Sequence, residues 1–184
     1  MKAICVGGDD FRLYADSAIH RNNQPVFLPD IDGGWSVCIC PAVRLSRLGM
    51  HISRKFAARY YDSIGVACIF LPAGCGAKPL SLPERFFAMD SAFAVGQWVS
   101  VGQADASHVI ESGKSSITFS TEKLHVDATI ASLSEFMTFK MGDLLLFANQ
   151  SLSYDITEGD DISVLFDSMP CIDMKIKYLL CLLD

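Results

Sequence analysis

The sequence predicts a β-rich α/β fold with a few short helices, and three features of the chain lead to this prediction. Hydrophobic residues make up 51% of the 184 residues, which is enough to bury a sizeable core and excludes a disordered chain. Apolar runs of strand length recur along the chain between turns rich in Gly, Pro and Asp. Apolar residues at helical spacing are prominent in only two segments. No repeat, low-complexity tract or charge run divides the sequence, so we expect a single domain over residues 1–184.

The expected strands are short apolar runs bounded by turn residues. They cover residues 2–6, 25–29, 35–45, 63–71, 93–101, 117–120, 144–147, 162–166 and 174–183. Residues 63–71 are apolar or β-branched at nearly every position, which is typical of a strand covered on both faces. Residues 112–114, with the sequence Ser-Gly-Lys, predict a hairpin turn, and the Gly- and Pro-rich residues 74–83 predict a loop.

Two helices are expected, one in each half of the chain. After Ser53, apolar residues recur at helical spacing between residues 56 and 61, and Ser53 is suited to cap that helix. In the second half, Ile130 and Leu133 lie on one face of a helix that we expect Asp127 to cap.

The charge of the chain excludes several classes of partner. Fifteen Lys and Arg residues stand against 21 Asp and Glu, which gives a formal charge of −6, and the basic residues are spread along the sequence. Nucleic acid is therefore excluded, because phosphate binding needs clustered basic residues. No apolar run reaches the roughly 18 residues of a membrane span, and the first residues lack the apolar stretch of a signal peptide. We expect a cytoplasmic protein that contacts neither nucleic acid nor a membrane.

The cysteines and histidines of the sequence are its candidate ligands for a soft metal ion. The seven cysteines are an odd number without a secretion signal, which favours reduced core thiols over disulfides. Cys38 and Cys40 would place two thiols on one face of a strand, a pair suited to Zn²⁺ or Cu(I) if further ligands exist. The histidines are scattered, and we interpret each as a surface or structural residue. They are His20, His51, His108 and His125.

Several short motifs, in one order along the chain, resemble the fumarylacetoacetate hydrolase family. They are Arg47-Leu48-Gly49, Arg59-Tyr60-Tyr61-Asp62, Trp98-Val99-Ser100, Gly142-Asp143-Leu144-Leu145 and Gly159-Asp160. The family includes acylpyruvate hydrolases, oxaloacetate decarboxylases and related isomerases, and the resemblance extends from about Lys2 to the C-terminus. It implies a mixed β-sandwich or β-roll that forms a homodimer.

The resemblance also implies what the catalytic parts would be. Family members hold Mg²⁺ or Mn²⁺ with a Glu-x-Glu pair on one strand and an Asp on a later strand. The metal anchors a 2-oxo acid and stabilises its enolate when a C–C bond breaks or a proton moves. A Lys, a His-Glu dyad on an N-terminal loop and a Gly-Thr-Pro turn complete the site in the hydrolases.

Aligned without gaps, the present sequence lacks these parts. The Glu-x-Glu positions fall on Cys38 and Cys40, the Asp position on Ile69, and the Lys position on or near Phe87. Asp90 occupies a place where the family often has Asp. Residues 148–150, Ala-Asn-Gln, replace the Gly-Thr-Pro turn, and the N-terminal segment is shortened and has no His-Glu pair.

We therefore predict a non-catalytic member of the fold, without Mg²⁺ or Mn²⁺, that serves binding or partner assembly. Its expected partner is a second copy, an active homologous subunit or a small acidic metabolite. A divergent hydrolase or isomerase of 2-oxo acids or acylpyruvates remains an alternative, with a metal held by Asp9, Asp10 or Asp90. A thiol-based soft-metal or redox protein using Cys38 and Cys40 is the third interpretation. The residues expected to line any residual pocket are Asp9, Asp10, Asp90, Asn149 and Gln150.

Overall fold

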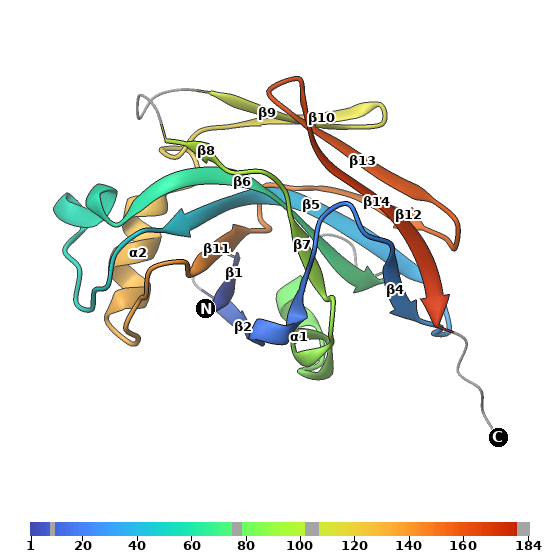
Figure 1. Ribbon diagram of the computed structural model, residues 1–184. Coiled ribbons are helices and arrows are strands. Elements are labelled where there is room, and N and C mark those ends of the chain that lie inside the picture. The colour runs from blue at the N-terminus through green and yellow to red at the C-terminus, as the bar shows by residue number, and fades with distance from the viewer. Residues whose placement is uncertain (8–9, 75–78, 102–106, 180–184) are drawn as a thin grey trace.

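Figure 1 shows the computed structural model of the chain, which describes residues 1–7, 10–74, 79–101 and 107–179. Strands dominate and the helices are short, which confirms the predicted β-rich class. The helices in these residues all lack the length and apolarity required to cross a membrane.

The larger sheet has the strand order β2-β1-β11-β5-β6-β7-β3, with β12 paired to β5 and β8 paired to β6. Its strands are β1 (Ala3–Gly7), β2 (Asp10–Tyr14), β3 (Ile19–His20), β5 (Trp35–Leu45), β6 (Tyr61–Pro72), β7 (Phe93–Val95), β8 (Val99–Ser100), β11 (Leu144–Phe147) and β12 (Leu152–Ile156). The long antiparallel pair of β5 and β6 forms the spine of this sheet, and Figure 1 shows both strands curving across the molecule. Both strands are apolar along most of their length, so both faces of the spine are buried.

The smaller sheet has the order β10-β9-β13-β14-β4. Its strands are β4 (Val26–Pro29), β9 (His108–Ser112), β10 (Ser115–Phe119), β13 (Asp161–Phe166) and β14 (Met169–Leu179). The predicted hairpin turn between β9 and β10 is present, with Gly113 in the left-handed region at φ +59°. Along β13, buried and exposed residues alternate, as expected for a strand with one covered face.

Helices occupy the connections between the strands. They are α1 (Arg85–Ala88), α2 (Val126–Ser134) and the 3-10 helices η1 (Asp16–Ala18), η2 (Arg54–Arg59) and η3 (Pro79–Ser81). The prediction of a helix reaching residue 61 was wrong in extent, because Tyr61 already pairs with Leu45 as the first residue of β6. Ser53 holds the predicted cap position of η2, although its side chain makes no capping hydrogen bond. The predicted cap of α2 was wrong, because His125, not Asp127, holds that position.

Strand boundaries differ from prediction at several places. The expected strand over residues 93–101 is divided into β7 and β8, because the chain at Gly96 approaches β14 too closely for a side chain. The C-terminal strand begins at Met169 rather than at residue 174. Two edge strands, β2 and β12, were missed, since both are largely exposed and carry polar residues. The short helix α1 was missed between the expected loop, which ends at residue 83, and the strand expected from residue 93.

Two hydrophobic cores lie on opposite faces of the larger sheet. The first contains Val37 and Ile39 of β5 together with residues of α2 and of the smaller sheet. The second contains Cys38 and Cys40 of β5 with residues of α1, β2 and β7. Figure 1 accordingly shows the smaller sheet on one side of the spine and α1 on the other. The alternation of side chains along β5 thus places the two cysteines in the second core.

Candidate functional site

The residues predicted to occupy the former metal position come together on one face of the spine. Cys38 of β5 pairs directly with Ile69 of β6, and Cys40 pairs with Ala67. Because residues two apart on a strand share a face, the side chains of Cys38, Cys40 and Ile69 point to the same side of the sheet. All three are fully buried in the second core.

Aromatic residues cover this face. Phe87 of α1, at the position expected for the family's Lys, packs against Tyr14 of β2 with 5.1 Å between ring centroids. Tyr14 also packs against Phe93 of β7 at 5.1 Å. Phe87 is 2% exposed and belongs to the same core as Cys38, Cys40 and Ile69. This face of the sheet is therefore packed with apolar and sulfur-containing side chains, whereas the family resemblance implies a charged site there.

The thiols on this face interact with one another. The thiol of Cys40 hydrogen-bonds to Cys38, and this bond lowers the pKa of Cys38. Burial opposes the shift, and a hydrogen bond with Ser151 adds to it. The hydrogen bond between the two thiols and burial raise the pKa of Cys40 well above its ordinary value. Burial, with a smaller effect of Cys38, also raises the pKa of Cys5. The pKa of Tyr14 is raised first by burial and then by these thiols, so its phenol stays neutral.

Solved structures that match this fold include proteins described as hydrolases and isomerases. A protein from Yersinia pestis described as a fumarylacetoacetate hydrolase family member matches with a TM-score of 0.76 and 19% identity, over 95% of this chain and 91% of that chain. A 2-hydroxyhepta-2,4-diene-1,7-dioate isomerase from Mycobacterium marinum matches with a TM-score of 0.78 and 21% identity, covering 96% and 74%. Maleylpyruvate hydrolase from Sphingobium, in complex with manganese and pyruvate, matches with a TM-score of 0.77 and 18% identity, over 96% of this chain and 70% of that chain.

The chain has the fumarylacetoacetate hydrolase fold. No protein-family model matches the sequence, and no curated protein matches it. The resemblance of the short sequence motifs is therefore supported at the level of the fold, and the activities in these names remain those of the matched proteins.

The residues at the expected metal position do not fit the Mg²⁺ or Mn²⁺ that the fold family implies. Hard cations take carboxylate, carbonyl and water oxygens, whereas Cys38 and Cys40 offer sulfur and Ile69 offers no donor atom. Among the described residues, no group of three or more His, Cys, Asp or Glu side chains is placed to hold an ion. The misfit between this site and a hard cation lies in the chemistry of the side chains, because the backbone brings Cys38, Cys40 and Ile69 together on paired strands.

The residues expected to line a residual pocket do not gather at this face. Asp10 and Asn149 instead line a cavity of about 350 Å³ on the side of the sheet covered by α2. Gln150 lies beside Asn149 and its side-chain amide donates to the Lys123 carbonyl at 3.1 Å. Asp90 is exposed in the turn after α1, and Asp9 lies outside the described residues. The structure therefore places Asp10 and Asn149 on the face of the sheet opposite to Cys38 and Cys40.

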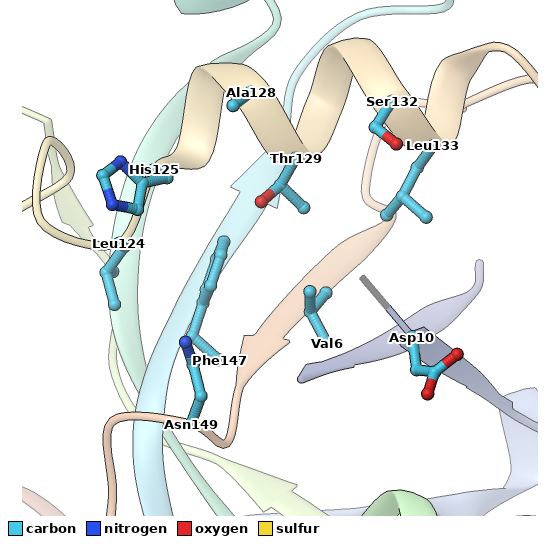
Figure 2. Close-up of a pocket in the computed structure, with 10 residues that line it drawn as sticks. All are labelled: Val6, Asp10, Leu124, His125, Ala128, Thr129, Ser132, Leu133, Phe147 and Asn149. Atoms are coloured by element: carbon cyan, nitrogen blue, oxygen red, sulfur yellow. The ribbon is translucent and has the colours of Figure 1, made fainter. Parts of the chain in front are cut away.

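The cavity beside α2 is built largely from residues that the sequence did not indicate. Figure 2 shows Thr129 and Ser132 pointing from α2 toward Val6 and Phe147 on the sheet. His125, interpreted as a surface or structural residue, lies at one end of the cavity and Asp10 at the other, so they do not form a dyad. Thr129 and Ser132 follow helical spacing, but in the sequence nothing distinguishes them from other polar helix residues.

Proposed function

We propose that this chain is a non-catalytic protein of the fumarylacetoacetate hydrolase fold that acts by binding a protein partner. The observation that carries the proposal is the direct pairing of Cys38 with Ile69, with Cys40 on the same buried face. In the fold family a hard cation held by oxygen atoms stabilises the enolate, and this set of side chains supplies no such oxygen atoms.

The changes at this face are mutually consistent in physical terms. A Lys left in an apolar core without a counterion, or a carboxylate left without its metal, would cost several kcal/mol. Loss of one charged group therefore favours loss of the others, and Phe87 now packs against Tyr14 where a Lys was expected. The result is a face that contributes to stability through packing.

The binding role has two forms in our proposal. Assembly with a second copy or with an active homologous subunit fits the fold family, whose members are expected to form dimers. A small acidic metabolite is less well supported, because the carboxylate of Asp10 lies at the cavity beside α2 and would repel it.

Metal binding tests the proposal. We expect isothermal titration of the purified chain with Mn²⁺ to give no binding at this face. The variant Cys38→Glu/Cys40→Glu/Ile69→Asp restores the oxygen ligands, and we expect it to gain Mn²⁺ binding if the backbone positions correspond to the family site. Cys38→Ser/Cys40→Ser is the matched control, because it changes both thiols without adding carboxylates. Stoichiometric Mn²⁺ binding by the wild-type chain that the restored site does not alter would place the metal elsewhere and contradict the proposal.

A second candidate is a soft-metal site formed by Cys38 and Cys40. The hydrogen bond between the two thiols favours it, since it lowers the pKa of Cys38 toward the thiolate that such a metal requires. Full burial of both residues opposes it, because an ion must enter a packed core. The alternative of a rebuilt hard-metal site is weakened, since Asp10 and Asp90 lie in different parts of the molecule.

A further inference from the structure

Four large apolar side chains project from the surface at one end of the molecule. Leu48, Phe136 and Met141 are 71%, 75% and 77% exposed, and Met50 is 46% exposed. They belong to two loops, the one after β5 and the one after α2, which lie at the left of Figure 1. We call these four residues the apolar tip.

Hydrogen bonds join the two loops and fix the apolar tip in place. Gly49 and Phe139 exchange backbone hydrogen bonds of 3.2 and 2.8 Å. The amide of His51 donates to the Ser134 carbonyl at 2.8 Å, and the amide of Ile52 donates to the Ser134 hydroxyl at 2.8 Å. The two loops that carry the exposed side chains are therefore already ordered before binding, which lowers the entropic cost of binding a partner.

The charges around the apolar tip are mainly positive, although the chain as a whole is acidic. No Asp or Glu occurs between residues 33 and 61, a segment that contains five of the fifteen Lys and Arg residues. Arg47 and Lys140 are exposed beside Leu48 and Met141. Glu135, next to Phe136, is an exposed acid at this end, whereas the nearby Asp143 is buried and paired with Lys2.

We propose that the apolar tip docks a different protein through a segment that carries bulky apolar residues flanked by carboxylates. Such a segment would cover the four apolar side chains and pair with Arg47 and Lys140. A symmetric dimer through the same surface would instead bring these basic residues of the two copies together. Methionine suits this role because its flexible thioether adapts to the shape of a partner. The proposal rests on the binding role given above, narrows it at this surface to a protein other than a second copy, and does not depend on the metal position.

A labelled peptide tests this docking surface. The probe is a fluorescein-labelled helical peptide with Leu and Phe on one face, flanked by Glu, and binding to the full chain is followed by fluorescence anisotropy. We expect Leu48→Ser/Phe136→Ser to weaken binding about tenfold or more, because these side chains would form the centre of the contact. Arg47→Glu/Lys140→Glu should weaken binding to a similar extent. Met169→Ser is the matched control, since Met169 is 68% exposed at the start of β14, and we expect less than about a twofold effect.

Several outcomes would overturn the docking proposal. These are failure of the wild-type chain to bind the acidic peptide, equal binding of a peptide with Lys in place of Glu, and unchanged binding by the Leu48→Ser/Phe136→Ser variant. Binding to phosphatidylserine vesicles in preference to the peptide would identify a membrane instead. Self-association in sedimentation that the same variant abolishes would identify a second copy. None of these results changes the Mn²⁺ titration, so failure here is distinguishable from failure of the non-catalytic assignment.

Discussion

The buried carboxylate of Asp143 connects the start of the chain to the loop before β11. It is fully buried, and its two oxygens accept hydrogen bonds from the amides of Lys2 and Lys140, each at 2.8 Å. The Lys2 ammonium lies 2.8 Å from the same carboxylate. Burial by itself would raise the pKa of Asp143, but these hydrogen bonds and the Lys2 charge outweigh it and hold the pKa below its ordinary value.

Replacement of Asp143 by Asn should destabilise the protein and reduce the dependence of its stability on pH. The folded-state pKa lies below the unfolded value, so the carboxylate stabilises the fold above the unfolded pKa and loses this effect as pH falls through the folded one. We expect Asp143→Asn to lower the free energy of unfolding by about 3–5 kcal/mol at neutral pH, measured by urea denaturation. Asp62→Asn is the control, because Asp62 forms an exposed 4.0 Å pair with Arg44. It should change stability by less than about 1 kcal/mol, and an equal effect of the two substitutions would contradict the argument.

At the level of elements, Gly96 sets where β7 ends and how closely it approaches β14. Its amide donates to the Val66 carbonyl at 2.9 Å, which keeps the chain beside β6. A Cβ at this position would collide with the Cys171 sulfur and come within 3.0 Å of the Cys171 carbonyl oxygen. The close approach holds the two sheets together at this point.

Substitution of Gly96 by Ala should therefore loosen the contact between the sheets. We expect Gly96→Ala to lower the free energy of unfolding by about 1–3 kcal/mol in urea denaturation, because the neighbouring atoms are too close to accommodate a methyl group. The double variant Gly96→Ala/Cys171→Ala removes the sulfur and should recover part of the loss relative to Cys171→Ala alone. Strictly additive effects would show that the collision does not control this contact.

For the whole molecule, the second core closes the face on which the resemblance to the family predicts the former metal position. Cys5, Cys38, Cys40, Cys68 and Cys171 are all buried free thiols. Reagents and metal ions in solution would reach them only when the fold opens. The chain therefore protects its thiols by packing.

Thiol labelling measures whether this core is closed. In a Cys75→Ser/Cys181→Ser variant, which leaves only the five buried cysteines, we expect a disulfide reagent such as DTNB to react at the rate of unfolding and to accelerate with urea. Fast reaction of Cys38 under native conditions would reveal access to the former metal face. Tight Cu(I) binding by the same variant, lost in Cys38→Ser/Cys40→Ser, would favour the soft-metal candidate.

The strands that could be predicted well from the sequence are uninterrupted apolar runs that end at turns. Residues 35–45 and 144–147 were predicted with the bounds of β5 and β11, since burial on both faces leaves little ambiguity. The cap at Asp127 failed because capping depends on the backbone entering the helix, and His125 enters α2 in a left-handed conformation at φ +54°. Ser53 holds the predicted cap position of η2 but makes no side-chain capping hydrogen bond. The strands β2 and β12 were missed because each is only five residues long and largely exposed, although the residues of β12, Leu-Ser-Tyr-Asp-Ile, alternate between apolar and polar as a strand does.

For the candidate site too, the sequence predicts some features and only the tertiary structure determines the others. The resemblance to the family predicts that Cys38, Cys40, Ile69 and Phe87 occupy the former catalytic positions, and the chemistry of these side chains argues against a hard cation. Only the pairing of β5 with β6 and the placement of α1 decided that these residues meet in one packed core, because such contacts join segments distant along the chain. The separation of Asp10 and Asn149 onto the opposite face was likewise a tertiary result, since the side on which a residue lies depends on strand register and on what covers each face.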